Sequence, residues 1–219
     1  MEQTVKENNI TTGVIWKQLL IFFFPILIGT FFQQLYNTVD TIVVGQYVGT
    51  LALAAVGTTG TMINLLVGFF VGVSSGATVI ISQFFGAGDA KNVSRAVHTS
   101  MALALVGGLI ITVLGLLTAR PSLVMLGVPE EILGDALTYM NVYYAGIIAC
   151  MIYNVGTGVL RAIGDSRMPL YVLIVCCLVN IVLDLLFVVG FHWGVFGVAI
   201  ATALSQVVSA VLIMLRLML

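Results

Sequence analysis

Residues 96–119 read AVHTSMALALVGGLIITVLGLLTA, a stretch of 24 residues without a single Asp, Glu, Lys or Arg. A helix rises about 1.5 Å per residue, so roughly 20 apolar residues cross the hydrocarbon core of a bilayer. Five other stretches are equally free of charge, at 18–39, 41–88, 136–160, 168–183 and 185–215. Their apolar character is continuous rather than alternating, which excludes the strands of a transmembrane barrel. The sequence therefore predicts an all-α fold, a polytopic transmembrane bundle of six helices.

The composition indicates a chain whose solvent is lipid. Of the 219 residues, 60% are hydrophobic and 8% are charged, whereas soluble domains carry about 25% charged residues. A net charge of −1 with eight Lys and Arg residues excludes the basic surface that nucleic-acid binding needs. The three cysteines lie inside apolar runs without Cys-x-x-Cys spacing, so we interpret them as small hydrophobic residues. The chain has no phosphate-binding loop or dinucleotide-binding turn, and no cofactor is expected.

Charged residues and glycines set the expected ends of the six spans. We expect a cytoplasmic N-terminal segment (1–16) followed by a six-helix transmembrane lobe (17–219). Its helices are predicted at about 17–44, 52–84, 92–118, 133–160, 169–189 and 195–217. The first apolar run has no small-x-small cleavage site, so we expect a retained helix rather than a removed signal peptide.

The basic residues predict how the chain is oriented. Short loops rich in Lys and Arg stay in the cytoplasm. On one predicted side of the bundle lie Lys6, Lys17, Lys91, Arg95, Arg161, Arg167 and Arg216, and on the other side only Arg120. Both termini are therefore expected to face the cytoplasm, with the chain in the cytoplasmic (inner) membrane.

Two acidic residues fall well inside predicted spans, Asp40 in the first and Asp184 in the fifth. A charged Asp at mid-bilayer costs about 2.5–3.5 kcal/mol on insertion scales, so such residues face the bundle interior, a partner or water. Polar residues at helical spacing accompany them. These are Gln33, Tyr36 and Asn37 on the first span, Tyr139, Tyr143 and Asn154 on the fourth, Asn180 on the fifth, and Thr202, Ser205, Gln206 and Ser209 on the sixth.

Two carboxylates with amide and hydroxyl oxygens suit a hard cation such as Na⁺. They suit a shared proton equally, because two like charges at close range resist ionising together. The structural alternative is that each Asp makes a buried hydrogen bond between helices. We favour the functional interpretation for the two acids, leave both open for Asn180 and Thr202, and expect Ser205 and Ser209 to be structural. No Lys or Arg lies deep in a span, which favours cationic or neutral cargo over phosphate-bearing cargo.

Several separated stretches resemble the multidrug and toxic compound extrusion (MATE) family. They are FQQLYNTVD at 32–40, VGQYVG at 44–49, LAAVG at 53–57, QFFGAGD at 83–89 and LRAIGDSRMP at 160–169. The stretches occur in the order typical of the family and extend over nearly the whole chain.

The resemblance implies secondary active multidrug efflux, the export of cationic amphipathic compounds in exchange for Na⁺ or H⁺. It implies a coupling-cation site, which would ligate the ion if it is Na⁺, formed by Asp40, Asn180, Asp184 and Thr202. A polar cavity around that site would include Tyr36, Tyr139 and Asn154 by resemblance, with Gln33 and Asn37 on the same helical stripe.

Family members carry twelve helices in two six-helix lobes with the drug cleft between them. This chain therefore resembles the N-terminal lobe, a fragment or half-transporter. Its expected partners are the lipid bilayer, cationic drug-like molecules and a second six-helix lobe, either a missing C-terminal half or another subunit.

The sequence admits three alternatives to efflux. A lipid-linked oligosaccharide flippase of the same superfamily is expected to need intramembrane Arg or Lys, which this chain lacks. A non-transporting membrane fragment is the second. An intramembrane aspartyl protease is suggested by the Gly-x-Gly-Asp pattern at 86–89, but Asp89 adjoins Lys91 and Arg95 in a predicted cytoplasmic loop. We interpret this glycine loop and the one at 164–167 as helix ends capped by Asp, and we do not expect an enzyme.

A hinge is predicted in the first span at Pro25 and Gly29. Proline removes one backbone hydrogen bond and permits a kink. We hypothesise that cation occupancy at Asp40 and Asp184 changes the packing of this helix, which couples the ion to a conformational change if it binds two states unequally.

Overall fold

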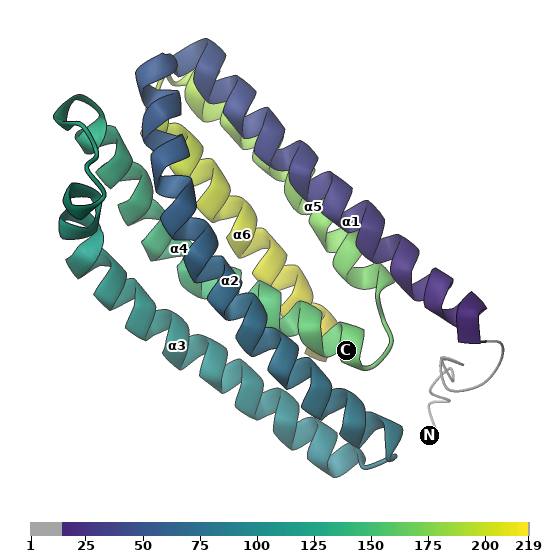
Figure 1. The fold of residues 1–219 in the computed structure, drawn as a ribbon. Coiled ribbons are helices and arrows are strands. Elements are labelled where there is room, and N and C mark those ends of the chain that lie inside the picture. The colour runs from purple at the N-terminus through teal and green to yellow at the C-terminus, as the bar shows by residue number, and fades with distance from the viewer. Residues whose placement is uncertain (1–14, 219) are drawn as a thin grey trace.

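The computed structural model describes residues 15–218, which form six long α-helices (Figure 1). They are α1 (Ile15–Val43), α2 (Thr50–Gly86), α3 (Ala90–Met125), α4 (Glu130–Ala162), α5 (Arg167–Asp184) and α6 (Gly194–Met218). Two short π-helices follow α1 and α5 directly, η1 (Val44–Val48) and η2 (Leu185–Gly190). All six helices are long and apolar enough to cross a membrane. The described residues contain no strand, and the predicted all-α membrane bundle is confirmed.

One predicted boundary was wrong. The third helix was expected to end at 118, before Arg120 and Pro121, but α3 continues to Met125 with Pro121 inside it. Proline removes only one backbone hydrogen bond, so the helix passes it and ends where Gly127 follows, with the amide of Leu126 donating to the carbonyl of Ser122. The predicted cytoplasmic segment 1–16 lies outside the described residues except for its last two.

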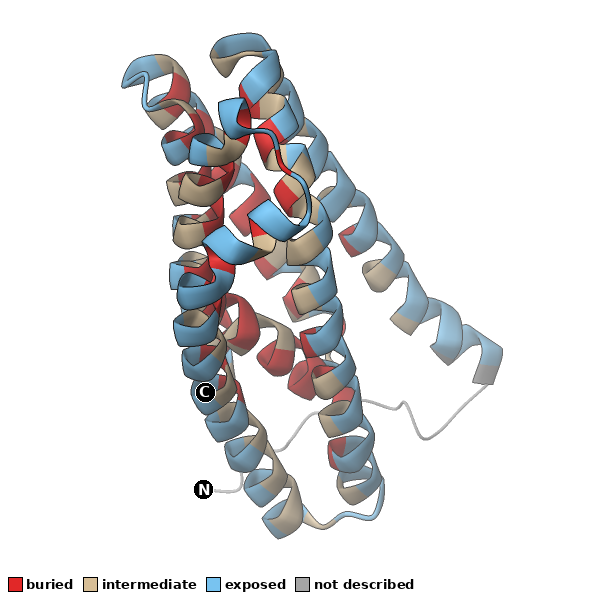
Figure 2. Ribbon diagram, turned by 60° about the vertical axis from the view of Figure 1, so that its left-hand side comes forward, coloured by how far each residue is buried: buried red, intermediate tan, exposed pale blue. Residues whose placement is uncertain are grey.

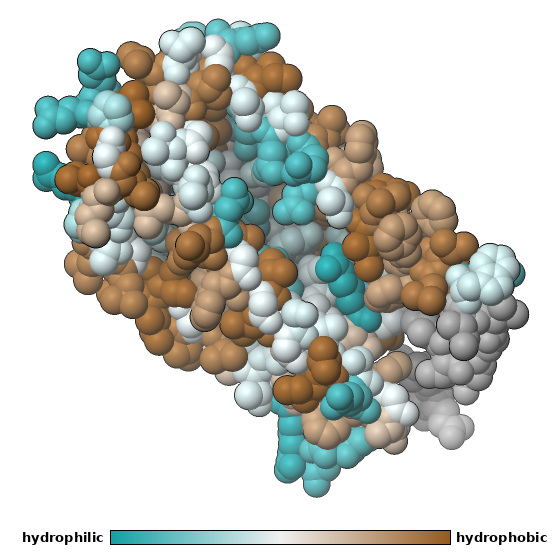
Figure 3. Space-filling model, viewed as in Figure 1, coloured by the Kyte–Doolittle hydropathy of each residue, from teal (hydrophilic) through white to brown (hydrophobic). Residues whose placement is uncertain are grey.

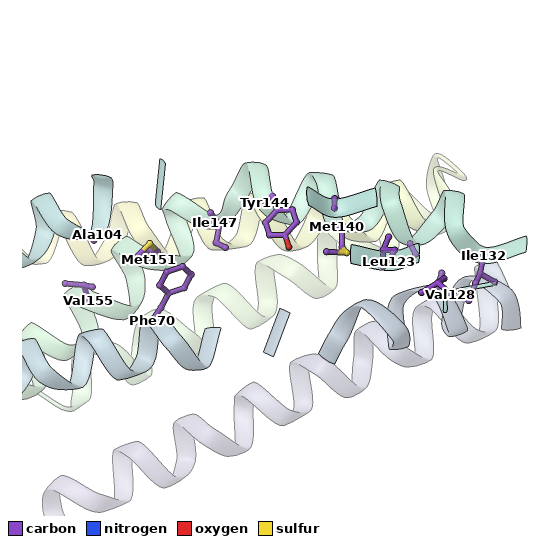
Figure 4. Packing of buried hydrophobic residues seen from close by; sticks show 13 residues of the cluster. Phe70, Ala104, Leu123, Val128, Ile132, Met140, Tyr144, Ile147, Met151 and Val155 are labelled. Carbon is purple, nitrogen blue, oxygen red and sulfur yellow. The ribbon is translucent and has the colours of Figure 1, made fainter. Parts of the chain in front are cut away.

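Helix α4 is the centre of the bundle. It packs against α2, α3 and α6, while α1 packs along α5 and α5 along α6. Phe70 of α2 lies beside Met151 of α4 in the main hydrophobic core, which continues along α4 through Ile147 and Met140 (Figure 4). Within the described residues α1 packs along its length against α5, and its C-terminal end also packs against α2, α4 and α6. Most of α1 is exposed (Figure 2).

The exposed surface of the bundle is rich in large apolar side chains. Leu65 of α2 is 73% exposed and Leu117 of α3 is 71% exposed, although both lie well inside long helices. A soluble monomer rarely exposes large contiguous apolar patches, whereas a helix in a bilayer presents such side chains to lipid. The described chain is therefore a multi-pass membrane protein.

The two glycine loops have the structural role predicted for them. Gly88 and Gly164 end their helices with φ of 72° and 88°, a left-handed conformation that glycine adopts without steric cost. The carboxylate of Asp89 accepts from the Asn92 amide at 3.0 Å, and that of Asp165 from the Met168 amide at 3.0 Å. Each Asp therefore caps the start of the next helix.

Close packing of α4 depends on small residues. A Cβ added at Gly158 would lie 2.5 Å from Ser74 Oγ, 2.6 Å from Thr78 Oγ1 and 3.3 Å from the Ser74 carbonyl oxygen. Ser74 Oγ donates to the Asn154 carbonyl at 2.8 Å, so it cannot move aside without losing that bond. At Gly158, α2 therefore lies too close to α4 to leave space for a side chain.

Replacing Gly158 by Ala is expected to destabilise the fold by about 1–3 kcal/mol, because the methyl group has no space and forces α2 away from α4. The measurement is the Tm of the purified chain in detergent. Gly57→Ala on α2 is the matched control, since a Cβ there meets nothing within 4 Å and alanine favours a helix. Equal melting of both variants would contradict the packing argument.

Candidate functional site

Asp40 and Asp184 lie together inside the bundle, where α1 meets α5. Asp40 is 8% exposed and Asp184 is fully buried. Both are placed by their helices: Asp40 faces inward near the end of α1, and Asp184 is the last residue of α5. The structure therefore brings the two predicted acids together away from lipid.

Asn180 joins the two acids. It is fully buried on α5, one turn before Asp184, so both side chains leave the same face of that helix. With its amide nitrogen turned toward the acids, the orientation that gives each group a partner, Nδ2 lies 2.8 Å from Asp40 Oδ1 and 3.1 Å from Asp184 Oδ2. A single amide therefore donates to a carboxylate from each of two helices.

Thr202 brings α6 to this cluster. It is 5% exposed, and the hydroxyl groups of Tyr36 and Tyr139 lie close to it as well as to Asp40. Thr202 Oγ1 and Asp184 Oδ1 are both buried without a hydrogen-bond partner among the described residues. Unpaired buried oxygens are costly, and an acceptor-rich cluster of this kind suits a bound cation.

The chemistry of the cluster selects among cations. Its potential ligands are carboxylate, amide and hydroxyl oxygens, the donors preferred by hard cations. Within residues 15–218 no group of three or more His, Cys, Asp or Glu side chains could hold a metal ion. The oxygen ligands of the cluster are chemically compatible with Na⁺ or with a shared proton.

Three residues of the predicted polar cavity are not brought to the acids. Gln33 and Asn37 are exposed, and Asn37 Nδ2 donates to Gln34 Oε1 at 3.4 Å on the outside of α1. Asn154 Nδ2 donates to the Cys150 carbonyl at 2.8 Å within α4. The stripe on α1 spans a wider arc than one neighbouring helix can cover, so only Tyr36 and Asp40 turn inward. The place of Gln33, Asn37 and Asn154 in a polar cavity stays a prediction.

The expected structural serines of α6 behave as predicted. Ser205 Oγ donates to the Thr202 carbonyl and Ser209 Oγ to the Gln206 carbonyl, both at 2.8 Å. Gln206 is different, because its Oε1 is buried without a partner. The sequence carried a signal for it, the i, i+4 spacing from Thr202, but its role was not inferred.

The predicted hinge residues lie within an unbroken helix. Pro25 is inside α1, which runs continuously from Ile15 to Val43. Gly29 is buried against α5, where an added Cβ would lie 3.5 Å from Leu173 Cδ2 and 3.9 Å from Leu170 Cδ1. Bending at Pro25 stays a prediction.

Six membrane-length helices that hold two carboxylates in their interior define a polytopic membrane protein with an acidic intramembrane site. The chain belongs to the MatE family, whose model matches residues 25–186. A similar relative is the probable multidrug resistance protein YoeA of Bacillus subtilis (strain 168), 28% identical over 207 residues. That match covers 93% of this chain and 45% of the relative, so the chain spans about half the length of the relatives it matches.

Solved structures show the same fold. An outward-facing multidrug resistance MATE family transporter of the MOP superfamily has 31% identity and a TM-score of 0.92, over 99% of this chain and 48% of that one. An inward-facing structure of such a transporter has 32% identity and a TM-score of 0.80, over 84% of this chain and 42% of that one. The structure described here is thus more similar to the outward-facing one.

Proposed function

We propose that this chain is one lobe of a secondary active transporter of the cytoplasmic membrane that exports cationic amphipathic compounds in exchange for Na⁺ or H⁺. The observation that carries the proposal is the Asp40–Asn180–Asp184 cluster, in which two acids share one amide donor inside a membrane bundle. Burying ionisable side chains inside a membrane bundle costs free energy, and such side chains mark ion or proton pathways. The multidrug resistance names of similar proteins support the same function.

The cluster supplies a physical basis for coupling. Its acids belong to α1 and α5, so a cation held between them neutralises a repulsion between two helices that pack on each other. Asn180 alone cannot do this, because a neutral amide contributes two donors but no charge. If one conformation of the bundle holds the cation more tightly than another, binding shifts the equilibrium between them.

The cargo is inferred from charge and exposure. Hydrophilic residues gather between α1 and α2 on one face of the bundle (Figure 3). Gln34 and Asn37 of α1 and Thr61 and Asn64 of α2 are exposed at these helices. Amide and hydroxyl groups are costly in lipid, so this face fits a wet cleft closed by a second six-helix lobe. With acids but no Lys or Arg deep in the described spans, such a cleft favours cations.

A transport assay tests the proposal. Cells that express this chain together with the C-terminal six helices of a relative are expected to accumulate less ethidium, a cationic amphipathic compound, than cells with either half alone. Asp40→Asn is expected to abolish the difference, because the site loses half its charge. Asp135→Asn, the same change at an exposed position of α4, serves as the control. Ion-dependent efflux that survives Asp40→Asn would refute the proposal.

A further inference from the structure

A small cavity lies between α4 and α6, next to Thr202. Its volume is about 10 Å³, which is close to the space that one water molecule needs. It is lined by Tyr143, Gly146, Cys150, Thr202, Ala203 and Gln206. Among the lining groups, Tyr143, Cys150, Thr202 and Gln206 carry polar atoms, so the cavity meets the polar requirement for hydration as well as the size requirement.

Two oxygen atoms at this cavity have no partner. Thr202 Oγ1 and Gln206 Oε1 are both buried without a hydrogen bond among the described residues. The two residues are four apart on α6 and therefore lie on the same face, one turn from each other. One water molecule that accepts from Thr202 and donates to Gln206 would satisfy both oxygens at once.

The direction of the Thr202 hydroxyl proton matters for the acidic cluster. A hydroxyl group has one proton and two lone pairs, and Thr202 lies between the cavity and the tyrosines that adjoin Asp40. A proton that points toward the acids would repel a cation there. A proton that points into the cavity leaves the lone pairs facing the acids, where they can ligate a cation.

We propose that a water molecule in this cavity, held by Gln206, accepts a hydrogen bond from the Thr202 hydroxyl and so orients Thr202 as a ligand of the cation between Asp40 and Asp184. Gln206 is then a positioning residue that acts through Thr202. The inference rests on the proposed cation site, and it adds a residue and a water molecule that the acidic cluster itself does not contain. Neighbouring Ser205 and Ser209 cannot replace Gln206, because each donates its proton to a carbonyl of its own helix.

A double-mutant cycle tests this. Na⁺ affinity is measured by calorimetric titration at about pH 8 for the wild type, Thr202→Val, Gln206→Met and the double variant. Gln206→Met keeps the length of the side chain but removes the acceptor. We expect the Kd for Na⁺ to rise about tenfold, as it does when other groups that orient a metal ligand are removed. The double variant should bind no more weakly than Thr202→Val alone.

The outcomes separate the inference from the proposed function. Unchanged binding in Gln206→Met, or losses that multiply in the double variant, would refute the role of Gln206, because a residue that only packs gives additive effects. If the wild type binds no Na⁺, the cycle is repeated on proton binding, followed by the carboxyl band in infrared spectra. A wild type that binds neither ion at Asp184 refutes the proposed function. A high-resolution structure that shows no water between Thr202 and Gln206 refutes the inference alone and leaves the proposed function standing.

Discussion

Asp184→Asn is expected to weaken Na⁺ binding by at least about 100-fold, because it removes a buried charge that the cation would neutralise. Asn has the size of Asp, and the fully buried site therefore keeps its packing. The loss of one carboxylate should leave Asp40 and Asn180 in contact, since that hydrogen bond does not involve Asp184. Calorimetric titration with Na⁺ over a range of pH checks the effect. The same titration shows whether protons compete for the site.

The control is Asp135→Asn, which makes the same chemical change at an exposed position near the start of α4. It should leave the Na⁺ affinity unchanged. If Asp184→Asn bound Na⁺ as tightly as the wild type at every pH, the pair of acids would be only a structural contact between α1 and α5.

Asn180→Leu is expected to destabilise the bundle by about 2–4 kcal/mol near neutral pH, since it leaves two buried carboxylates without their shared donor. The cost should shrink as the pH falls, because a protonated acid can donate to the other one and the repulsion disappears. The variant is therefore expected to be more stable at low pH and to lose stability as the pH rises. Thermal melting in detergent at about pH 5 and pH 8 measures the difference.

Asn64→Leu is the matched control, because it makes the same chemical change at an exposed position of α2. It should melt like the wild type at both pH values. A pH-independent loss of stability in Asn180→Leu would mean that Asn180 fills space and does not hold the acids.

The helices and the acids were predictable from the sequence because they depend on the local residue pattern and on the free energy of placing a charge in lipid. Charge-free runs of sufficient length must cross the membrane, and an Asp within such a run must find a partner. The i, i+4 spacing of Asn180 and Asp184 then places both on one face of α5. Their meeting with Asp40 follows from the packing of α1 on α5.

The remaining features depend on how the helices pack. The inward turn of Tyr36 and the exposure of Asn37 follow from the side on which α5 packs along α1, and no residue pattern in the sequence reports that side. The cavity at Gln206 exists because α4 and α6 leave a gap there. The end of α3 was missed since Pro121 is tolerated near a helix end, while Gly127 was the stronger stop signal.

The one-sided packing of α1 has a mechanical meaning. The main core around α4 contains no residue of α1, so an outward movement of the N-terminal part of α1 would leave that core intact. Val39 and Val43, near the C-terminal end of α1, pack in a second cluster with residues of α2, α4 and α6. Segments with few buried contacts open at low free energy, and α1 is continued by η1 into the turn that leads to α2. Helix α1 is thus held along one side by α5 and at its C-terminal end by η1. Asp40 lies near that C-terminal end, so a rotation of α1 about it would move the N-terminal half far while Asp40 moves little.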